Sequence, residues 1–185
     1  MRKLFFAACA FVMAAFVVSC TESNEPSLVG EWQSDKVEQN GEGVSGWMTY
    51  KMTLNADSTM SMGIDALQNI KEEKADITMP FKVSYAGKWA DLKEKLVWCP
   101  DTATTKIELI QDSIKIKMGD PSMDAFADKL VKSLVENFDK EMGAQIKKET
   151  VAEPDTSVYK LNGDELSVFT KTDTIVFHRQ KPAAK

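Results

Sequence analysis

The chain has 185 residues, of which 43% are hydrophobic and 28% are charged, and its formal net charge is −5. This length and composition are typical of one globular domain with a sizeable core. The acidic excess argues against nucleic acid as a partner, because such binding depends on basic side chains that neutralise phosphates. It also argues against electrostatic attraction to anionic lipids.

The amino-terminal segment predicts a secretion signal. Arg2 and Lys3 form a short positive region, and residues 4–18 are apolar without interruption. A helix of that length spans about 22 Å, which is less than the roughly 30 Å hydrocarbon core of a bilayer. The segment therefore fits a cleaved signal peptide over residues 1–19 better than a membrane span.

The residues around the expected cleavage point carry a more specific pattern. Val17-Val18-Ser19-Cys20 resembles the lipobox of bacterial lipoproteins. That resemblance implies cleavage before Cys20 and a thioether-linked diacylglycerol on its sulfur. Two or more acyl chains hold a protein stably at a membrane. The alternative is an ordinary signal peptide with an incidental cysteine.

The resemblance also bears on the location. In lipoproteins of enteric bacteria an Asp after the cysteine commonly retains the protein in the inner membrane, and Thr21 stands there instead. We therefore expect a lipid-anchored protein of the bacterial cell envelope, with the outer membrane favoured over the inner. Residues 20–27 are small, polar and acidic, and predict a lipidated flexible tether.

The mature chain would be more acidic and would lack an internal disulfide. Without Arg2 and Lys3 it keeps 21 basic against 28 acidic residues, a formal charge of −7. Of the 3 cysteines, Cys9 is lost with the signal and Cys20 carries lipid, which leaves Cys99 alone. The expected domain, residues 28–180, must therefore be held by its core.

Alternation of apolar and polar residues with period two dominates the domain and predicts antiparallel strands with one dry face. Asn162-Gly163 predicts a tight hairpin between two of them. We expect about eight to ten strands in a mainly β fold, an antiparallel barrel. The alternating segments are 48–54, 60–64, 81–85, 107–109, 114–118, 159–161, 166–168 and 175–177.

One segment, near residues 121–142, has helical periodicity instead. Phe126, Leu130, Leu134 and Phe138 follow one another at four-residue steps, which predicts one long amphipathic helix inserted before the last strands. The helix is either a lid or partner-binding element, or a cover for sheet surface.

Catalysis finds little support in the sequence. The single histidine, His178, cannot form the usual multi-histidine metal site. No nucleophile elbow, glycine-rich phosphate loop or calcium loop is present. We therefore expect a non-catalytic protein with no metal and no cofactor.

Methionine is frequent on the inward phase of the predicted strands, where Val and Ile are the commoner choice. Flexible thioethers suit a surface that fits varied apolar ligands, and they equally suit core filling. Two tyrosines on this phase can orient the polar end of a ligand with their hydroxyls. The candidate ligand pocket of the barrel interior is Tyr50, Met52, Met60, Met62, Phe81, Val83 and Tyr85.

The most specific sequence pattern of the domain combines residues from its first and last expected strands. Gly30 and Trp32 lie on the first expected strand, and Arg179 closes the last one as the only arginine after the signal. A lone arginine among lysines favours a geometric role, because a guanidinium stacks on an indole and donates several fixed hydrogen bonds.

A Gly-x-Trp on the first strand with an arginine at the last strand resembles the signature of lipocalin and wider calycin barrels. Combined with Cys20, the chain is similar to small lipocalin-like lipoproteins of Gram-negative bacteria. The helix lies earlier than in classical lipocalins, and the cysteine pairs of secreted members are missing. The resemblance implies a lipocalin-like barrel over 28–180, with residues 181–185 as a disordered tail.

The resemblance also implies binding of a small hydrophobic ligand without chemistry on it. The alternative is a non-catalytic structural or protein-interaction module, with a filled barrel or sandwich and a protein partner that the sequence does not identify. In both cases the expected membrane contact is the lipid anchor at Cys20.

Overall fold

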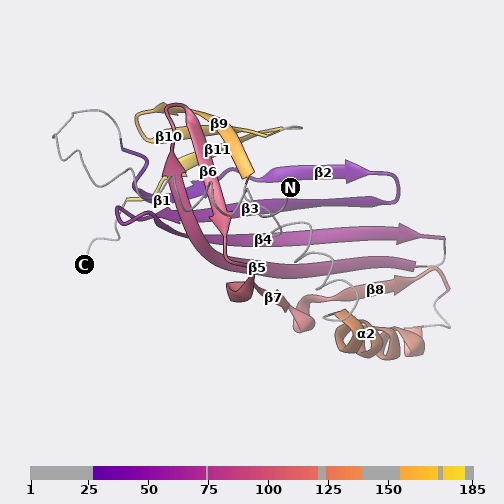
Figure 1. Cartoon of the computed structure of the whole chain (residues 1–185). Helices are drawn as coiled ribbons and strands as arrows, with labels where there is room; N and C mark the ends of the chain where they lie inside the picture. Colours follow the sequence, from indigo (N-terminus) through magenta and orange to yellow (C-terminus); the bar gives the residue numbers. More distant parts are fainter. Residues whose placement is uncertain (1–26, 74, 121–123, 139–154, 171–172, 182–185) are drawn as a thin grey trace, which may run out of the picture.

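The computed structural model describes residues 27–73, 75–120, 124–138, 155–170 and 173–181 (Figure 1). The expected signal peptide, Cys20 with residues 20–26 of the tether, and residues 182–185 of the tail lie outside the described residues. So do residues 121–123 and 139–142 at the two ends of the expected helix.

The described part of the chain forms one antiparallel sheet of eleven strands. Each expected strand is present, because apolar side chains alternate toward one dry side of the sheet. The strands are β1 (Gly30–Ser34), β2 (Val37–Gly41), β3 (Val44–Leu54), β4 (Thr59–Glu72), β5 (Ala75–Asp91), β6 (Lys95–Pro100), β7 (Lys106–Leu109), β8 (Lys115–Met118), β9 (Asp155–Asn162), β10 (Glu165–Phe169) and β11 (Thr174–Arg179).

Eight of these strands close into a barrel. The ring runs β1-β11-β10-β9-β6-β5-β4-β3, and β3 pairs again with β1. Trp32 lies opposite Arg179 on one side of β1 and opposite Met52 on the other. The prediction of a mainly β, antiparallel barrel is confirmed.

Three long strands leave the barrel and continue as an open sheet. The second half of β3 pairs with β1 in the ring, whereas its first half pairs with β2. Likewise β5 pairs with β6 in the ring and with β7 and β8 farther along. We call β2, β7, β8 and the parts of β3, β4 and β5 beside them the sheet extension; it projects from the barrel in Figure 1.

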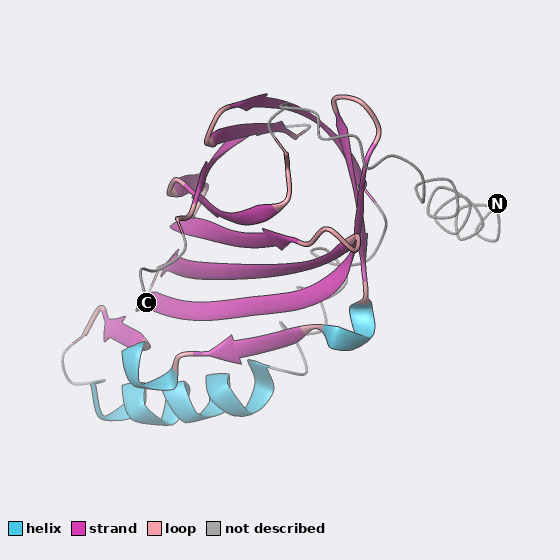
Figure 2. Ribbon diagram, turned by 90° about the vertical axis from the view of Figure 1, so that its left-hand side faces the viewer, coloured by secondary structure: helices cyan, strands magenta, loops and turns pink. Residues whose placement is uncertain are grey.

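The single α-helix of the described residues, α2 (Asp124–Phe138), packs on the sheet extension. It contacts β8, and Figure 2 shows it along that side of the sheet, away from the ring of strands. Phe138 is buried and its ring centroid lies 6.4 Å from that of Phe81 on β5. The helix therefore covers sheet surface, whereas Phe126 and Leu130 remain 50% and 43% exposed.

The barrel has one continuous core that begins at Leu28 and ends at Phe177. The predicted hairpin is present, with Gly163 at φ +60° between β9 and β10, and a second turn has Ser58 at φ +65° between β3 and β4. Ring closure and core both lie within the described residues. A chain of residues 21–185 therefore contains everything that closes and fills the barrel.

Candidate binding site

Trp32 and Arg179, the pair singled out in the sequence, contact each other where the first strand meets the last. Trp32 is 1% exposed, and its indole Nε1 donates a 2.8 Å hydrogen bond to the carbonyl of Leu28. The guanidinium carbon of Arg179 lies 4.1 Å from the centroid of the Trp32 ring. Arg179 Nη1 donates to the carbonyl of Val29 over 2.7 Å, and Nη2 donates to the carbonyl of Ser27. The arginine thus joins the last strand to the segment that precedes the first.

Gly30 makes this closure possible. Its φ of +144° lies in a region that L residues rarely adopt. A Cβ on Gly30 would also lie 2.6 Å from Arg179 Nη1, too close for an unchanged guanidinium. The glycine of the Gly-x-Trp pattern therefore leaves room, where a side chain would otherwise stand, for the arginine to reach the indole. This is a structural role, because Arg179 binds its own chain here.

The candidate pocket residues of the barrel interior all contact the core. Met52, Met60, Met62 and Val83 are buried in the core cluster, and Tyr50, Phe81 and Tyr85 are half-buried against it. The centroid of the Tyr50 ring on β3 lies 6.4 Å from that of the Phe177 ring on β11. Phe81 stands apart at the junction with the sheet extension, because it is opposite Leu109 and against Phe138.

The tyrosines of the barrel hold their hydroxyl protons more tightly than a free tyrosine does. Burial, together with the neighbouring Tyr50, raises the pKa of Tyr85 to about 12. Burial and the carboxylate of Asp173 raise the pKa of Tyr50. The Tyr50 hydroxyl lies 3.8 Å from the thioether sulfur of Met48, which is a weak acceptor. Burial, followed by its 2.8 Å hydrogen bond to Asp91, raises the pKa of Tyr159 to about 12.

All 3 tyrosines should therefore stay neutral in the folded protein at a pH where the unfolded chain carries phenolates. Because the folded pKa values lie above the ordinary value of 10.0, the unfolded state loses its tyrosine protons first. Stability contributed by these groups is complete below pH 10 and is lost between about pH 10 and pH 12. Phenolate absorbance during an alkaline titration, with and without urea, measures this. Coincident curves would contradict the expectation.

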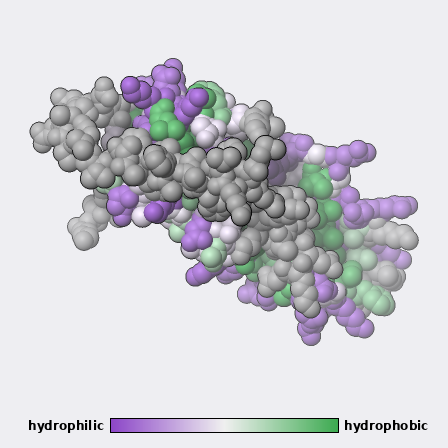
Figure 3. All heavy atoms as spheres, in the orientation of Figure 1, coloured by the Kyte–Doolittle hydropathy of each residue, from purple (hydrophilic) through white to green (hydrophobic). Residues whose placement is uncertain are grey.

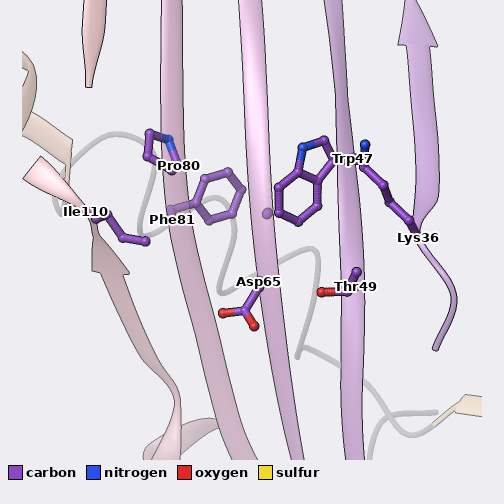
Figure 4. A pocket seen from close by; sticks show the side chains of 8 residues that line it. Lys36, Trp47, Thr49, Asp65, Pro80, Phe81 and Ile110 are labelled. Carbon is purple, nitrogen blue, oxygen red and sulfur yellow. The ribbon is translucent and has the colours of Figure 1, made fainter. Parts of the chain in front are cut away.

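A pocket of about 490 Å³ lies on the sheet extension, outside the barrel. We call it the outer pocket. Figure 4 shows Trp47 on β3 and Phe81 on β5, on either side of β4; strand register places Trp47 on the outer side of the sheet and Phe81 on the side of the barrel core. Asp65 and Thr49 lie beside them, and Lys36 borders the pocket next to Trp47. Its lining residues are Lys36, Trp47, Thr49, Asp65, Ala66, Pro80, Phe81 and Ile110.

The charged groups of the outer pocket already have partners. Lys36 Nζ lies 5.2 Å from the Trp47 ring centroid and 2.9 Å from a carboxylate oxygen of Glu38. Asp65 accepts a 3.1 Å hydrogen bond from Lys51 Nζ. The pocket can therefore hold an apolar body against Trp47, with one cation at its border and one neutralised carboxylate.

Of the residues that line the outer pocket, only Phe81 was predicted from the sequence. Trp47 could have indicated the pocket, because it occupies the same strand phase as the polar residues Thr49 and Lys51. An indole on the solvent-exposed face of an amphipathic strand indicates a surface that an apolar ligand or partner can cover.

The described residues contain no group of three or more His, Cys, Asp or Glu that could hold a metal ion. His178 lies on the outside of the barrel, where its Nε2 is 3.2 Å from Asp35. Of the helical residues that the structure describes, none belongs to a helix long and apolar enough to span a membrane. No protein-family model and no curated protein matches the chain.

Proposed function

We propose that this chain is a lipid-anchored, non-catalytic binding protein of the bacterial envelope, and that its ligand is a small hydrophobic molecule. The observation that supports this proposal is the outer pocket. Its volume of about 490 Å³ is within the range of small-molecule sites, about 300–1,000 Å³. Trp47, Pro80 and Ile110 give it the apolar lining with few polar groups that such sites have.

The anchor and the family resemblance belong to the same proposal. Cys20 follows a lipobox-like sequence, which favours attachment to a membrane through lipid, and Thr21 after it favours the outer membrane. A lipocalin-like relationship is supported by the contact between Trp32 and Arg179 and by the eight-stranded ring. Eight-stranded barrels either fill their interior or hold one small ligand.

We place the ligand in the outer pocket and not inside the barrel. The reason is packing: Met52, Met60 and Val83 are each at most 2% exposed and belong to one core cluster. Methionine fills irregular interior space well, so its abundance on the inward phase has a structural explanation. The half-buried Trp47 lies on the opposite face of β3.

Trp47→Ala should weaken binding of an uncharged apolar probe at least tenfold. N-phenyl-1-naphthylamine is such a probe, and we expect it to bind the chain of residues 21–185 with micromolar affinity. The expected loss follows from removing the largest apolar surface of the outer pocket, worth roughly 1.5–3 kcal/mol when covered. Probe fluorescence titration measures the affinity.

Phe169→Ala is the matched control, because Phe169 is an exposed aromatic residue (42%) on β10, in another part of the barrel. It should leave the affinity unchanged. Equal affinity in wild type, Trp47→Ala and Phe169→Ala would place the probe elsewhere and overturn the assignment of the site.

The second candidate function is a protein-interaction module with a filled barrel. Two observations favour it. Among the described strands β2 pairs only with β3, so its outer edge has no strand neighbour. Phe126 and Leu130, one helical turn apart on α2, are exposed. Failure of any apolar probe to bind the outer pocket would leave this candidate as the better one.

A further inference from the structure

The two faces of the sheet extension differ in chemistry. The face in phase with the barrel core carries Ile77, Met79 and Phe81, and α2 covers it through Phe138. The opposite face, which we call the outer face, carries Trp47, Thr49, Asp65 and Pro80 of the outer pocket, whereas the lining residues Ala66 and Phe81 belong by register to the covered face. Strand register assigns each residue to one face, because directly paired residues on neighbouring strands point to the same side.

A row of apolar residues crosses the outer face. Trp47 pairs with Leu67, and Leu67 pairs with Pro80 on the next strand. Ile110 continues the row, because its backbone N–H donates to the carbonyl of Pro80 over 3.0 Å. In Figure 3 hydrophobic and hydrophilic residues lie side by side over the end of the molecule that carries the sheet extension.

Lysines flank this apolar row on the same face. Six exposed lysines come from the strands themselves: Lys51, Lys71, Lys82, Lys106, Lys115 and Lys117. Lys36 adds a seventh cation at the outer pocket. The carboxylates of this face are fewer: Glu38, Asp65, Asp76 and Glu108. The outer face is therefore locally positive, although the whole chain has a formal charge of −5.

The carboxylate inside the outer pocket is neutralised by this arrangement. Asp65 is bonded to Lys51 and lies directly opposite Lys82 on β5. Lys36 is the cation nearest the apolar surface, since its Nζ lies over the Trp47 ring with Glu38 as its partner. An incoming anion can replace Glu38 at Lys36, because that pair is more than half exposed and such pairs contribute little.

We propose that the ligand of the outer pocket is a single-chain amphiphile with an anionic head group. Its apolar chain covers Trp47, Pro80 and Ile110, and its head group pairs with Lys36, while Lys82, on the same face opposite Asp65, adds to the positive potential. This inference rests on the proposed function, and it adds the charge of the ligand. The local excess of lysine disfavours a cationic amphiphile by the same electrostatic argument.

Two probes that differ only in charge test the inference on the chain of residues 21–185. The first is 11-(dansylamino)undecanoate, which is anionic, and the second is its uncharged methyl ester. We expect the anion to bind about tenfold more tightly at low salt, as an ion pair with Lys36 in lysine-rich surroundings would give. The double variant Lys36→Gln, Lys82→Gln should remove that difference by weakening the binding of the anion. Lys160→Gln, an exposed lysine on β9, is the matched control and should change neither affinity.

The outcomes separate the two proposals. If both probes bind equally and Trp47→Ala weakens both, the outer pocket is a binding site but the anionic preference is wrong. If neither probe responds to Trp47→Ala, the proposed site itself is wrong. A third arm uses phosphatidylglycerol vesicles. Lysine-dependent binding to vesicles without saturable binding of the monomeric anion would overturn the single-chain ligand in favour of a lipid surface.

Discussion

Arg179→Ala should lower the free energy of unfolding by roughly 2–4 kcal/mol, a large share of the stability of a domain of this size. The cation–π contact with Trp32, at 4.1 Å, accounts for about 0.5–2 kcal/mol of this. The hydrogen bonds to the carbonyls of Val29 and Ser27 add the rest, about 1.5–2 kcal/mol together, because one is only part-buried and the other is exposed, where a bond to a charged donor is worth less than it is when buried. The pair with Asp164 adds little, because that carboxylate is 70% exposed.

Two variants give this expectation its controls. Arg179→Lys keeps the positive charge but lacks the planar guanidinium with its several donors, so it should recover less than half of the lost free energy of unfolding. His178→Ala alters the adjacent, outward-facing residue and should change stability by no more than about 0.5 kcal/mol. Urea denaturation followed by tryptophan fluorescence measures all three. An Arg179→Ala midpoint equal to that of wild type would show that closure of the barrel does not depend on the guanidinium.

Cys20→Ala should abolish lipid attachment completely. In the lipoproteins that the chain resembles, the lipid is joined to the cysteine sulfur and the signal is cut just before that residue. Without the sulfur neither step can take place, so the variant should retain residues 1–19 and carry no diacylglycerol. Intact mass after expression in a Gram-negative host measures both changes at once.

Cys99→Ala is the control for the anchor, because Cys99 lies on β6 in the barrel wall. That variant should be processed and lipidated like the wild type. A Cys20→Ala protein with the electrophoretic mobility of the wild type, still in the detergent phase, would refute the anchor.

The sequence predicts the strands of the barrel ring well, because apolar residues recur at every second position wherever one side of a strand is buried in the core. Residues 48–54 and 60–64 alternate because one side of β3 and β4 faces the core. β2 was not predicted, since four of its five residues are exposed and no dry face generates a pattern. The far parts of β4 and β5 were also missed, because Gln68 and Asn69 interrupt the apolar phase where the strands leave the ring.

The site was less predictable than the fold for a physical reason. Alternation shows which side of a strand is dry, but not which strands close into a ring and which continue beyond it. The outer pocket depends on that second fact, since Trp47, Pro80 and Ile110 meet only where β3, β5 and the end of β7 form an open sheet. By contrast, the contact between Trp32 and Arg179 could be expected from the lone arginine together with the resemblance to the calycin signature.

The way the ring closes has a consequence for the order of folding. Arg179 Nη1 and the carbonyl of Val29 are 150 residues apart in sequence, and joining such distant points costs about 4 kcal/mol of chain entropy. β4 and β5 are consecutive and pair in one register from Glu72 and Ala75 to Thr59 and Lys88. We therefore expect that hairpin to belong to the folding nucleus, and the contact between Arg179 and Trp32 to form after the transition state. Loss of the guanidinium should then accelerate unfolding and leave the folding rate almost unchanged.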